Sequence, residues 1–199
     1  IDRDISIELD ELLAETAGKY RDGSALTPKI LEFISARAKT IFTDKGLRYD
    51  EIDACLSTGF YDFRELYRRA KSLSDFRRNE QFTQMLLSFK RMNNICSAFR
   101  KKEKDYSLSF NPALLAEEAE QKLFGFFDSR RGEIERFIGE NRYMELFELL
   151  IQGKPVIDAF FDTVMVMADD RAVRDNRLAL LEGILRPFKT LLDFSKISD

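Results

Sequence analysis

The chain has 199 residues and a formal net charge of -3, and 44% of its residues are hydrophobic while only 9 are Gly and 4 are Pro. This composition supplies a folded core and excludes a disordered tail or a small all-β fold. Histidine is absent, which excludes Ser-His-Asp and Cys-His catalysis and every zinc site that has a His ligand.

The first part of the chain is predicted to be helical. Leu, Ile and Ala alternate with Glu and Asp at helical spacing over residues 5–17, and residues 18–25 have the composition of a loop. Thr27 and Pro28 then form a helix start, with Thr as the N-cap and Pro at the first helical position. Gly46 is expected to end this helix as a left-handed cap. The predicted apolar stripe consists of Ile30, Phe33, Ile34, Ala38 and Ile41.

A short helix over residues 50–56 comes next, and Ser-Thr-Gly follows it at 57–59. We take this tripeptide as a domain boundary, which gives a helical segment at residues 1–58 and a helical domain at residues 59–199. The domain is predicted to begin with a helix over residues 60–73. The inward residues of that helix are predicted to be Phe63, Leu66, Tyr67 and Ala70.

The helix predicted over residues 80–101 has the clearest pattern. Its inward stripe, at a spacing of about 3.6 residues, consists of Phe82, Met85, Leu86, Phe89, Met92, Asn93, Cys96 and Phe99. Steps of about 100° per residue place Arg91 and Asn94 on the opposite face. We therefore expect Asn93 to be buried and hydrogen-bonded, and Arg91 and Asn94 to face solvent.

The rest of the chain is also predicted to be helical. Asn111 and Pro112 repeat the cap-plus-proline start, and Pro187 is expected to kink the last helix. The predicted helices cover residues 111–127, 133–138, 141–151, 155–167 and 169–194. Three acidic residues are expected at the surface of the first of these helices, namely Glu117, Glu118 and Glu120. Strand alternation and fixed repeats are absent from the sequence, so the predicted class is all-α, a helical bundle.

Charged side chains near the last two helices suggest a contact between them. Asp162 follows Asp158 at i,i+4, and Arg174 and Arg177 extend the buried stripe of the last helix. Antiparallel packing would then form an ion-paired clasp in which Asp162 meets Arg177. Asn176 points away from that stripe and is expected to be free to meet a ligand.

Basic residues gather in one part of the chain. Residues 60–104 contain 12 Lys and Arg against 5 Asp and Glu, in a chain that is otherwise acidic. Such a block is typical of a polyanion-binding face, although helix surfaces are charged in any case. Phosphate-binding glycine loops are absent, and no carboxylate pair has the pattern of an acid–base couple, so catalysis by this chain alone is not expected.

The sequence also bears on compartment. Cys55 and Cys96 lie inside predicted helices and are expected to be reduced core thiols of a cytoplasmic protein. No apolar run approaches the roughly 18 residues of a membrane span, and no signal peptide is visible. Because the chain begins with Ile1 rather than Met, we expect it to be a piece of a longer protein.

Several segments resemble one protein family. The run FFDTVMVM at 160–167, together with Asp170, Arg174 and NRLALL at 176–181, closely resembles the C-terminal signature of the bacterial glycyl-tRNA synthetase beta subunit. Residues 31–34 and 49–54 are similar to the end of its helical HD-like region. Residues 69–73 and 89–95 are similar to the lead into its anticodon-binding part.

This resemblance has implications for fold and function. It implies that residues 1–58 end an HD-like domain and that residues 59–199 form an all-helical DALR-type anticodon-binding domain. It also implies a part of a glycine–tRNA ligase, a tetramer of two alpha and two beta chains. In that enzyme the alpha chain uses ATP and Mg²⁺ to activate glycine, so no catalytic residue, metal or cofactor is expected in this chain. Glycine tRNA and the alpha chain are the implied partners, with no membrane and no DNA.

The implied ligand directs attention to basic and amide side chains. Unstacked anticodon bases can be bound at their edges by Arg and Asn and stacked on aromatic rings. The candidate RNA-binding residues are Lys90, Arg91 and Asn94, with Lys101 and Lys102 as phosphate contacts, and Arg171 and Asn176 as a second set. The alternative is a helical module for subunit or domain assembly, which would use exposed apolar patches without contacting RNA.

Overall fold

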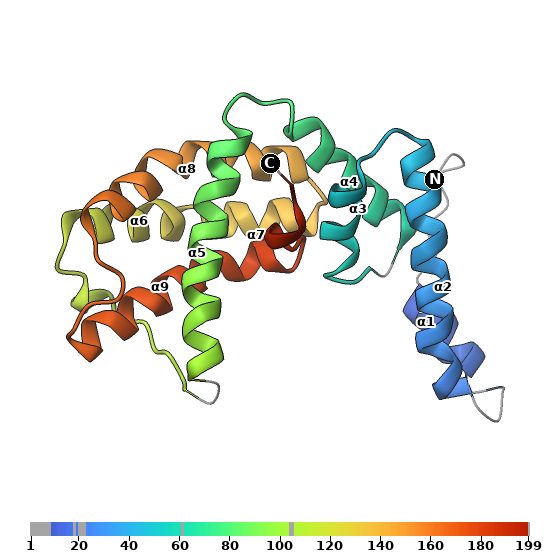
Figure 1. Ribbon diagram of the computed structural model, residues 1–199, viewed down its shortest axis with the longest axis horizontal. Helices are drawn as coiled ribbons and strands as arrows, with labels where there is room; N and C mark the ends of the chain where they lie inside the picture. Colours follow the sequence, from blue (N-terminus) through green and yellow to red (C-terminus); the bar gives the residue numbers. More distant parts are fainter. Residues whose placement is uncertain (1–8, 18, 20–22, 61, 104–105, 199) are drawn as a thin grey trace. The chain divides into compact units, whose positions relative to one another are not determined.

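The computed structural model describes residues 9–17, 19, 23–60, 62–103 and 106–198. All regular structure in these residues is helical, and none of them lies in a strand, which confirms the all-α class (Figure 1). The α-helices are α1 (Leu9–Ala17), α2 (Gly23–Asp44), α3 (Tyr49–Leu56), α4 (Phe63–Phe76), α5 (Phe82–Lys102), α6 (Glu118–Ser129), α7 (Arg131–Gly139), α8 (Tyr143–Thr163) and α9 (Arg171–Lys189). Two short 3₁₀ helices are η1 (Pro112–Leu114) and η2 (Phe194–Lys196). The predicted helical residues 5–8 lie outside the described residues.

The helices form two compact units. The first unit contains the chain up to Phe76 and again from Leu191 onward, and the second contains Arg77 to Thr190. The domain boundary that the sequence suggested at residues 58 and 59 stays a prediction, whereas the compact units of the fold divide after Phe76.

In the first unit, the C-terminal segment packs against α3. The backbone N–H of Asp193 donates to the carbonyl of Ala54 at 2.9 Å, and the Thr58 hydroxyl donates to the carbonyl of Leu191 at 3.1 Å. η2 also contacts α3 and buries Phe194. These contacts explain why residues distant in sequence belong to the same unit as α1–α4.

The helix α2 begins earlier than its sequence suggested. It starts at Gly23, so Pro28 lies inside it and the predicted helix start at Thr27 is wrong. Its end is as predicted, because Gly46 has a φ of +88°, a left-handed conformation that glycine adopts without strain.

The buried face of α2 also differs from the predicted stripe. Ala38 is buried as predicted, and its partner in the core is Phe42, which the stripe did not include. The helices α1 and α3 both pack on α2, and their positions decide which side of α2 is covered. The predicted stripe residues that are exposed instead are Ile30, Phe33 and Ile41.

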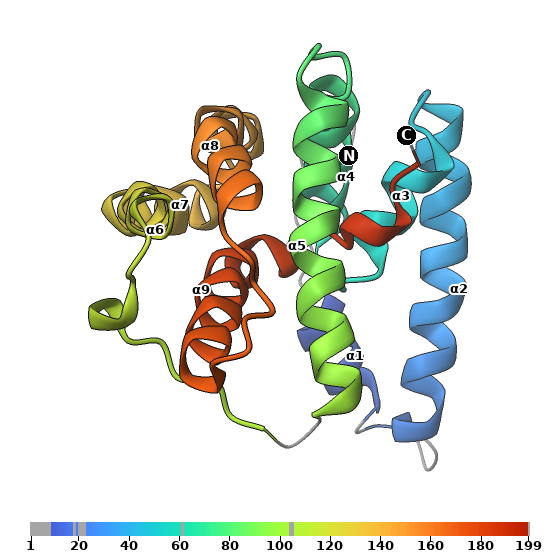
Figure 2. The ribbon, with the colours of Figure 1, turned by 60° about the vertical axis from the view of Figure 1, so that its left-hand side comes forward.

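In the second unit, α5 packs on α8 and α9, and α6 packs on α8 (Figure 2). The predicted apolar stripe of α5 is confirmed, since all of its Phe, Met, Leu and Cys members are buried, whereas Asn93 is half-buried. The rings of Phe89 in α5 and Phe188 in α9 meet edge to face, with centroids 5.3 Å apart. This contact places α9 against the inner face of α5.

The segment before α6 is not the continuous helix that was predicted. The side chain of Asn111 accepts a hydrogen bond from the Ala113 N–H at 3.0 Å, as a cap should, but it caps only the single turn of η1. α6 begins separately at Glu118, where Glu117 and Glu120 form a capping box. The cap was predicted correctly and the length of the helix was not.

The helix α8 runs without interruption through Pro155, so the predicted division into two helices is wrong. Proline removes one backbone hydrogen bond from a helix, yet buried residues lie on both sides of it, including Leu150 and Ile157. Gly153 is buried where α8 meets α6, since a β-carbon there would lie 2.8 Å from Phe126 Cε1. Glycine thus lets α8 approach the Phe126 ring of α6 closely, at a position that sequence reasoning assigned to a helix break.

The last helix, α9, begins as predicted. Asp170 is its N-cap, and its side chain accepts a hydrogen bond from the Val173 N–H at 3.0 Å. The helix ends at Lys189, so Pro187 lies in its last turn. The kink expected at Pro187 stays a prediction.

Candidate nucleic-acid interface

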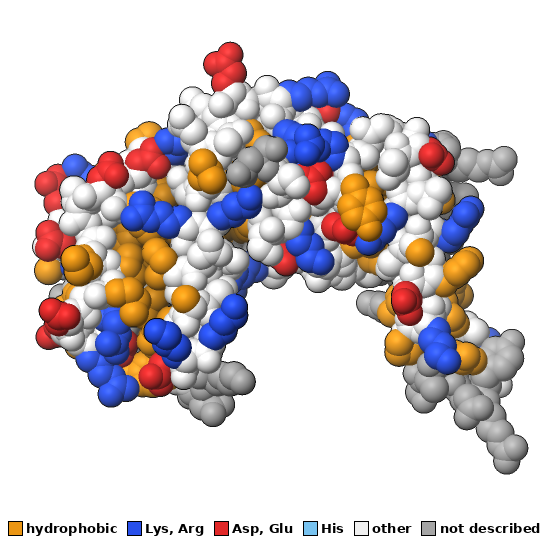
Figure 3. Space-filling view, viewed as in Figure 1, with side chains coloured by type: hydrophobic (Ala, Val, Ile, Leu, Met, Phe, Trp, Pro, Cys, Tyr) orange, Lys and Arg blue, Asp and Glu red, His pale blue; other side chains and the backbone are white. Residues whose placement is uncertain are grey.

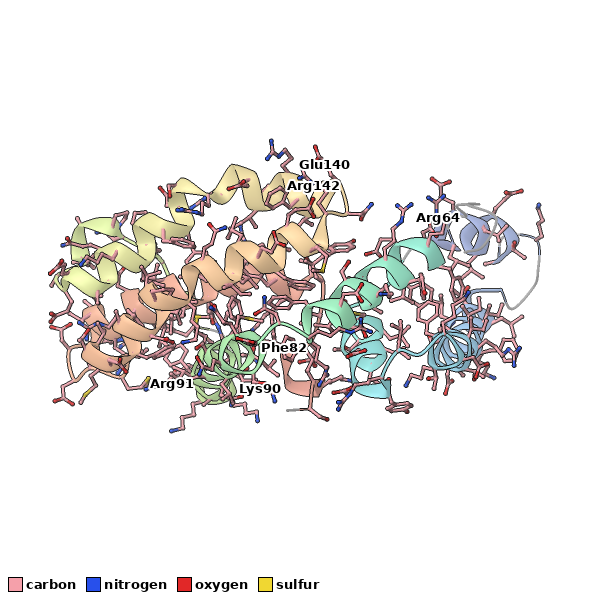
Figure 4. All side chains as sticks on the ribbon, turned by 90° about the horizontal axis from the view of Figure 1, so that it is seen from above. Arg64, Phe82, Lys90, Arg91, Glu140 and Arg142 are labelled. Atoms are coloured by element: carbon pink, nitrogen blue, oxygen red, sulfur yellow. The ribbon has the colours of Figure 1, made fainter. Side chains whose placement is uncertain are left out.

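The outer face of α5 presents basic and amide side chains. The helix contains five Lys and Arg residues and no Asp or Glu. Arg91, Asn94, Lys101 and Lys102 are exposed, and Lys90 is half-buried. Figure 4, which looks along α5, shows Lys90 and Arg91 on the outer side of this helix. The predicted outward positions of Arg91 and Asn94 are confirmed.

The exposed residues of α5 align along one side of the helix. Arg91, Asn94 and Lys101 are separated by three and seven residues, which is the spacing of side chains on a common helical face. In Figure 3, Lys and Arg side chains follow α5 toward its C-terminal end. Cations in the last turn of a helix also complement the helix dipole, which by itself accounts for Lys101 and Lys102 without a ligand.

Three cations of this face have no carboxylate partner among the described residues. Arg91 contacts the ring of Phe161 in α8, with its Cζ 4.3 Å from the ring centroid. Within the residues that the structure describes, Arg91, Lys101 and Lys102 form no ion pair with a carboxylate. An uncompensated row of cations is suited to attract a polyanion.

Arg100, in contrast, is used inside the unit. Its Nε and Nη2 donate to the two oxygens of Glu182 in α9 at 2.6 and 2.5 Å, and its Nη1 donates to the carbonyl of Tyr106. The hydrogen bonds that Arg100 donates to Glu182 raise the pKa of Arg100 above its ordinary value. This bidentate ion pair fixes α5 to α9 and leaves the guanidinium unavailable to a ligand.

Near the start of α9, a second group of polar side chains is also internally paired. The Tyr106 hydroxyl donates to Asp175 Oδ2 at 2.6 Å, and the guanidinium of Arg174 bonds to the same carboxylate. Burial raises the pKa of Asp175, but these two donors outweigh burial and leave the pKa below its ordinary value. Arg171 is exposed, yet it lies over the Tyr106 ring and 3.5 Å from Asp175. Arg171 is therefore less available to RNA than Arg91.

A mainly apolar groove of about 360 Å³ lies between α6, α7 and α9. Its apolar lining includes Phe110, Phe124, Ile134 and Ile184. Of the carboxylates at its rim, Asp128 pairs with Arg131 at 3.1 Å. The described residues contain no group of three His, Cys, Asp or Glu side chains placed to hold a metal ion, and none of their helices is long and apolar enough to cross a membrane.

Comparison with known proteins identifies the second unit and its C-terminal continuation. The profile of the DALR anticodon binding domain matches residues 85–198, which is more than half of the chain. The chain belongs to the DALR anticodon-binding domain family. All seven candidate RNA-binding residues lie within the matched region.

Curated relatives extend the similarity beyond the DALR domain. The chain is 30% identical over 201 residues to a glycine–tRNA ligase beta subunit of Clostridioides difficile, a match that covers 99% of the chain. It is 34% identical over 200 residues to the beta subunit of Acidobacterium capsulatum, which covers 97% of the chain. The chain spans 28% of the length of each of these relatives. The resemblance to glycyl-tRNA synthetase beta subunits is thus confirmed.

Within the DALR domain, Asn176 is not where sequence reasoning placed it. Its side chain is only 2% exposed, and its Oδ1 accepts a hydrogen bond from the Asn111 N–H at 2.7 Å. The prediction that Asn176 is free to meet a ligand is therefore wrong. The segment that leads into η1 crosses α9 on that side and covers it, a contact between residues 65 positions apart.

The predicted clasp between α8 and α9 is also wrong. Arg177 donates from Nε to Glu120 in α6 at 2.5 Å and from Nη1 to the Met165 carbonyl at 2.9 Å. Glu120 is 1% exposed, which also corrects its predicted surface position, while Asp162 is exposed. Arg174 bonds to its neighbouring aspartate instead. Because α6 also packs on α9, the partner of Arg177 comes from α6 rather than α8.

Phe161 is the side chain at this surface that sequence reasoning missed. Its neighbour Phe160 is fully buried in the core. A turn of about 100° then places Phe161 at the border between core and surface, where the structure shows it half-buried beneath Arg91. The double phenylalanine in the sequence indicated a side chain at the edge of the core. It did not indicate which helix would lie beside that side chain.

Proposed function

We propose that this chain is the tRNA-recognition part of a glycine–tRNA ligase beta subunit and that the outer face of α5 contacts the anticodon arm. The observation that carries this proposal is the row of exposed, uncompensated cations on α5 in a domain of the anticodon-binding family. The names of the curated relatives supply the amino acid and hence the tRNA.

Two kinds of contact would operate on this face. Lys101 and Lys102 would bind phosphates, while Arg91 and Asn94, one turn apart, would reach the edges and faces of unpaired bases. About 3–5 phosphate contacts would give a slope of log affinity against log salt concentration near -2 to -3.5, at roughly 0.7 per contact for single-stranded nucleic acid.

In the whole enzyme this chain would act without chemistry of its own. We propose an assembly of two alpha and two beta subunits in the cytoplasm, in which the alpha subunit binds ATP and Mg²⁺ and activates glycine. This chain would position the tRNA for charging and would hold no cofactor.

The decisive experiment is a footprint of the chain on glycine tRNA, with an anticodon-swapped tRNA as the control. We expect protection of the anticodon arm that weakens with the swap and with rising salt. Arg91→Ala and Asn94→Ala should weaken binding. Lys122→Ala should not, because Lys122 is an exposed cation on α6 that already pairs with Glu118. Protection confined to the acceptor arm, or affinity that is independent of salt, would contradict the proposal.

The alternative is an assembly module that binds another protein domain. The apolar groove between α6, α7 and α9 favours this alternative, because such surfaces mark protein contacts. The Arg91→Ala and Asn94→Ala variants separate the two functions. Recognition of tRNA predicts weaker tRNA binding with unchanged subunit assembly, whereas a pure assembly module predicts no effect on tRNA.

A further inference from the structure

Arg91 is held in place by an aromatic ring from a neighbouring helix. Its guanidinium carbon lies 4.3 Å from the centroid of the Phe161 ring, within the range of a cation–π contact. The two helices that carry them, α5 and α8, pack together. Three residues earlier on each helix, the Ser88 hydroxyl donates to Asp158 Oδ1 at 3.3 Å. Ring and guanidinium are therefore both fixed to helices rather than to loops.

The guanidinium of Arg91 remains accessible. Arg91 is exposed although its guanidinium carbon lies over the Phe161 ring, so part of this planar group is open to a ligand. The nearby carboxylates of Asp158 and Asp162 form no ion pair with this guanidinium in the described residues. Asp158 is bonded to Lys154 and Ser88, and Asp162 forms no ion pair with Arg91 in the described part of the chain.

The surroundings of this pair suit a base better than a lone phosphate. Asn94 lies one turn further along the same exposed face and offers both a donor and an acceptor. Figure 3 shows apolar side chains gathered between α5 and the loop that follows α8. That loop exposes Met165 and Met167, at 73% and 52%. A flat cation beside an apolar area and an amide matches the face and edge of an unpaired base.

We propose that the open face of the Arg91 guanidinium, backed by Phe161, stacks on one unpaired base of the bound RNA, and that Asn94 bonds to the edge of that base. This inference rests on the proposed function and adds its mode of contact. The bound group is thus a nucleobase in a single-stranded loop, and Phe161 acts as a positioning residue that orients Arg91.

A coupling experiment between protein and RNA tests the stacking directly. Glycine tRNA transcripts would each carry one abasic nucleotide in the anticodon loop, and their affinities would be measured for the unmodified chain and for Arg91→Lys. Lysine keeps the charge and loses the planar group. We expect Arg91→Lys to weaken binding of unmodified tRNA by about 5- to 150-fold, the change that corresponds to the loss of one base-stacking contact. At one loop position, removal of the base should abolish this difference.

Two further variants separate stacking from charge and from stability. Lys101→Ala should lower the salt slope by roughly 0.7 and should weaken binding of every abasic transcript equally, whereas Arg91→Lys should leave the slope unchanged. Phe161→Leu keeps an apolar side chain against α5 but removes the ring. It should reproduce the loss in Arg91→Lys at the same loop position, in protein that urea unfolding shows to be folded.

The outcomes distinguish this inference from the proposed function. If the unmodified chain does not bind tRNA in an anticodon-dependent way, the proposed function fails. If it does bind, but the effects of Arg91→Lys and base removal are additive at every position, the stacking fails alone. In that case the Arg91–Phe161 contact only fastens α5 to α8.

Discussion

The Arg177 guanidinium of α9 is bonded to the carboxylate of Glu120 in α6, although 57 positions separate them in the sequence. The other oxygen of Glu120 accepts the Glu117 N–H at 2.8 Å and so caps α6. Arg177 also donates to the carbonyl of Met165 in the loop before α9. One buried carboxylate thus stabilises the start of α6, its contact with α9 and the loop between α8 and α9.

Replacing Glu120 with Ala should strongly destabilise the second unit. The change leaves Arg177, which is 7% exposed, as a buried cation without its partner and also removes the cap of α6. Breaking a buried ion pair in this way costs about 3–5 kcal/mol. Urea unfolding monitored by circular dichroism would measure the loss.

Glu118 provides the matched control for this variant. It lies two residues earlier in the same first turn, but its side chain is 79% exposed and pairs with the exposed Lys122. Glu118→Ala should therefore change the free energy of unfolding by less than about 0.5 kcal/mol. Equal losses in the two variants would mean that the Glu120–Arg177 pair has no special structural role.

The sequence predicted best what depends on local periodicity. The core stripe of α5 follows from the 3.6-residue repeat, and the outward positions of Arg91 and Asn94 follow from the same geometry. The cap at Asp170 was predictable for a similar reason, because a cap bonds to a backbone N–H only three residues away.

What the sequence could not predict depends on long-range packing. Periodicity identified Arg177 as inward-facing, but it does not specify the helix that supplies the carboxylate. The prediction for Asn176 was wrong for a different reason. The residues from Asn176 to Leu181 are all buried, so this part of α9 is covered on every side and no turn angle leaves a free face. At Pro155, the packing of a 21-residue helix outweighs the loss of one backbone bond.

Gly153→Ala should destabilise the fold even though alanine favours helices. A β-carbon at Gly153 would lie 2.8 Å from Phe126 Cε1 and 3.3 Å from Phe127 Cζ, where α8 packs on α6. Overpacking of this kind costs about 1–3 kcal/mol, whereas replacing glycine in a helix gains only about 0.5–1 kcal/mol. Thermal or urea unfolding should therefore show a lower free energy of unfolding for Gly153→Ala than for the unmodified chain.

Gly125→Ala should have the opposite effect. Gly125 lies inside α6, and a β-carbon there would meet nothing within 4 Å. Only the higher helix propensity of alanine then acts, so we expect the free energy of unfolding to rise by about 0.5–1 kcal/mol.

The two variants together test the packing of α8 on α6. If Gly153→Ala were stabilised like Gly125→Ala, α6 would be able to move away from α8 without loss of stability.

The two cysteines should be unreactive in the folded protein. Burial raises the pKa of Cys55 and of Cys96 to about 12, whereas a thiol in an unfolded chain has a pKa near 8.5. At pH 8, Ellman's reagent should therefore titrate no thiol in buffer and both thiols in urea. Rapid reaction of either thiol in buffer would show that its unit opens readily.

The same difference sets a pH dependence at the alkaline end. The folded state favours the protonated thiols, so their contribution to stability is complete below about pH 8.5 and is lost as the pH rises toward 12. Replacing both Cys55 and Cys96 with Ala would remove this dependence while leaving small cavities. The decline of the free energy of unfolding above pH 9 should then be shallower than in the unmodified chain.

Asp175 should make the second unit sensitive to acid. Burial alone would raise its pKa, but the Tyr106 hydroxyl and the Arg174 guanidinium hold the pKa below its ordinary value. The folded state therefore favours the carboxylate. Its contribution to the free energy of unfolding is complete above the unfolded pKa of about 3.9 and is lost as the pH falls through the lower folded pKa.

Two variants test this acid sensitivity. Asp175→Asn should lower the free energy of unfolding by about 1–3 kcal/mol at pH 7, and this difference from the unmodified chain should shrink below pH 4. Tyr106→Phe, which removes one donor, should move the loss to higher pH in urea titrations between pH 3 and pH 7. An unchanged difference between Asp175→Asn and the unmodified chain over that whole range would show that Asp175 is equally stabilised in the unfolded chain.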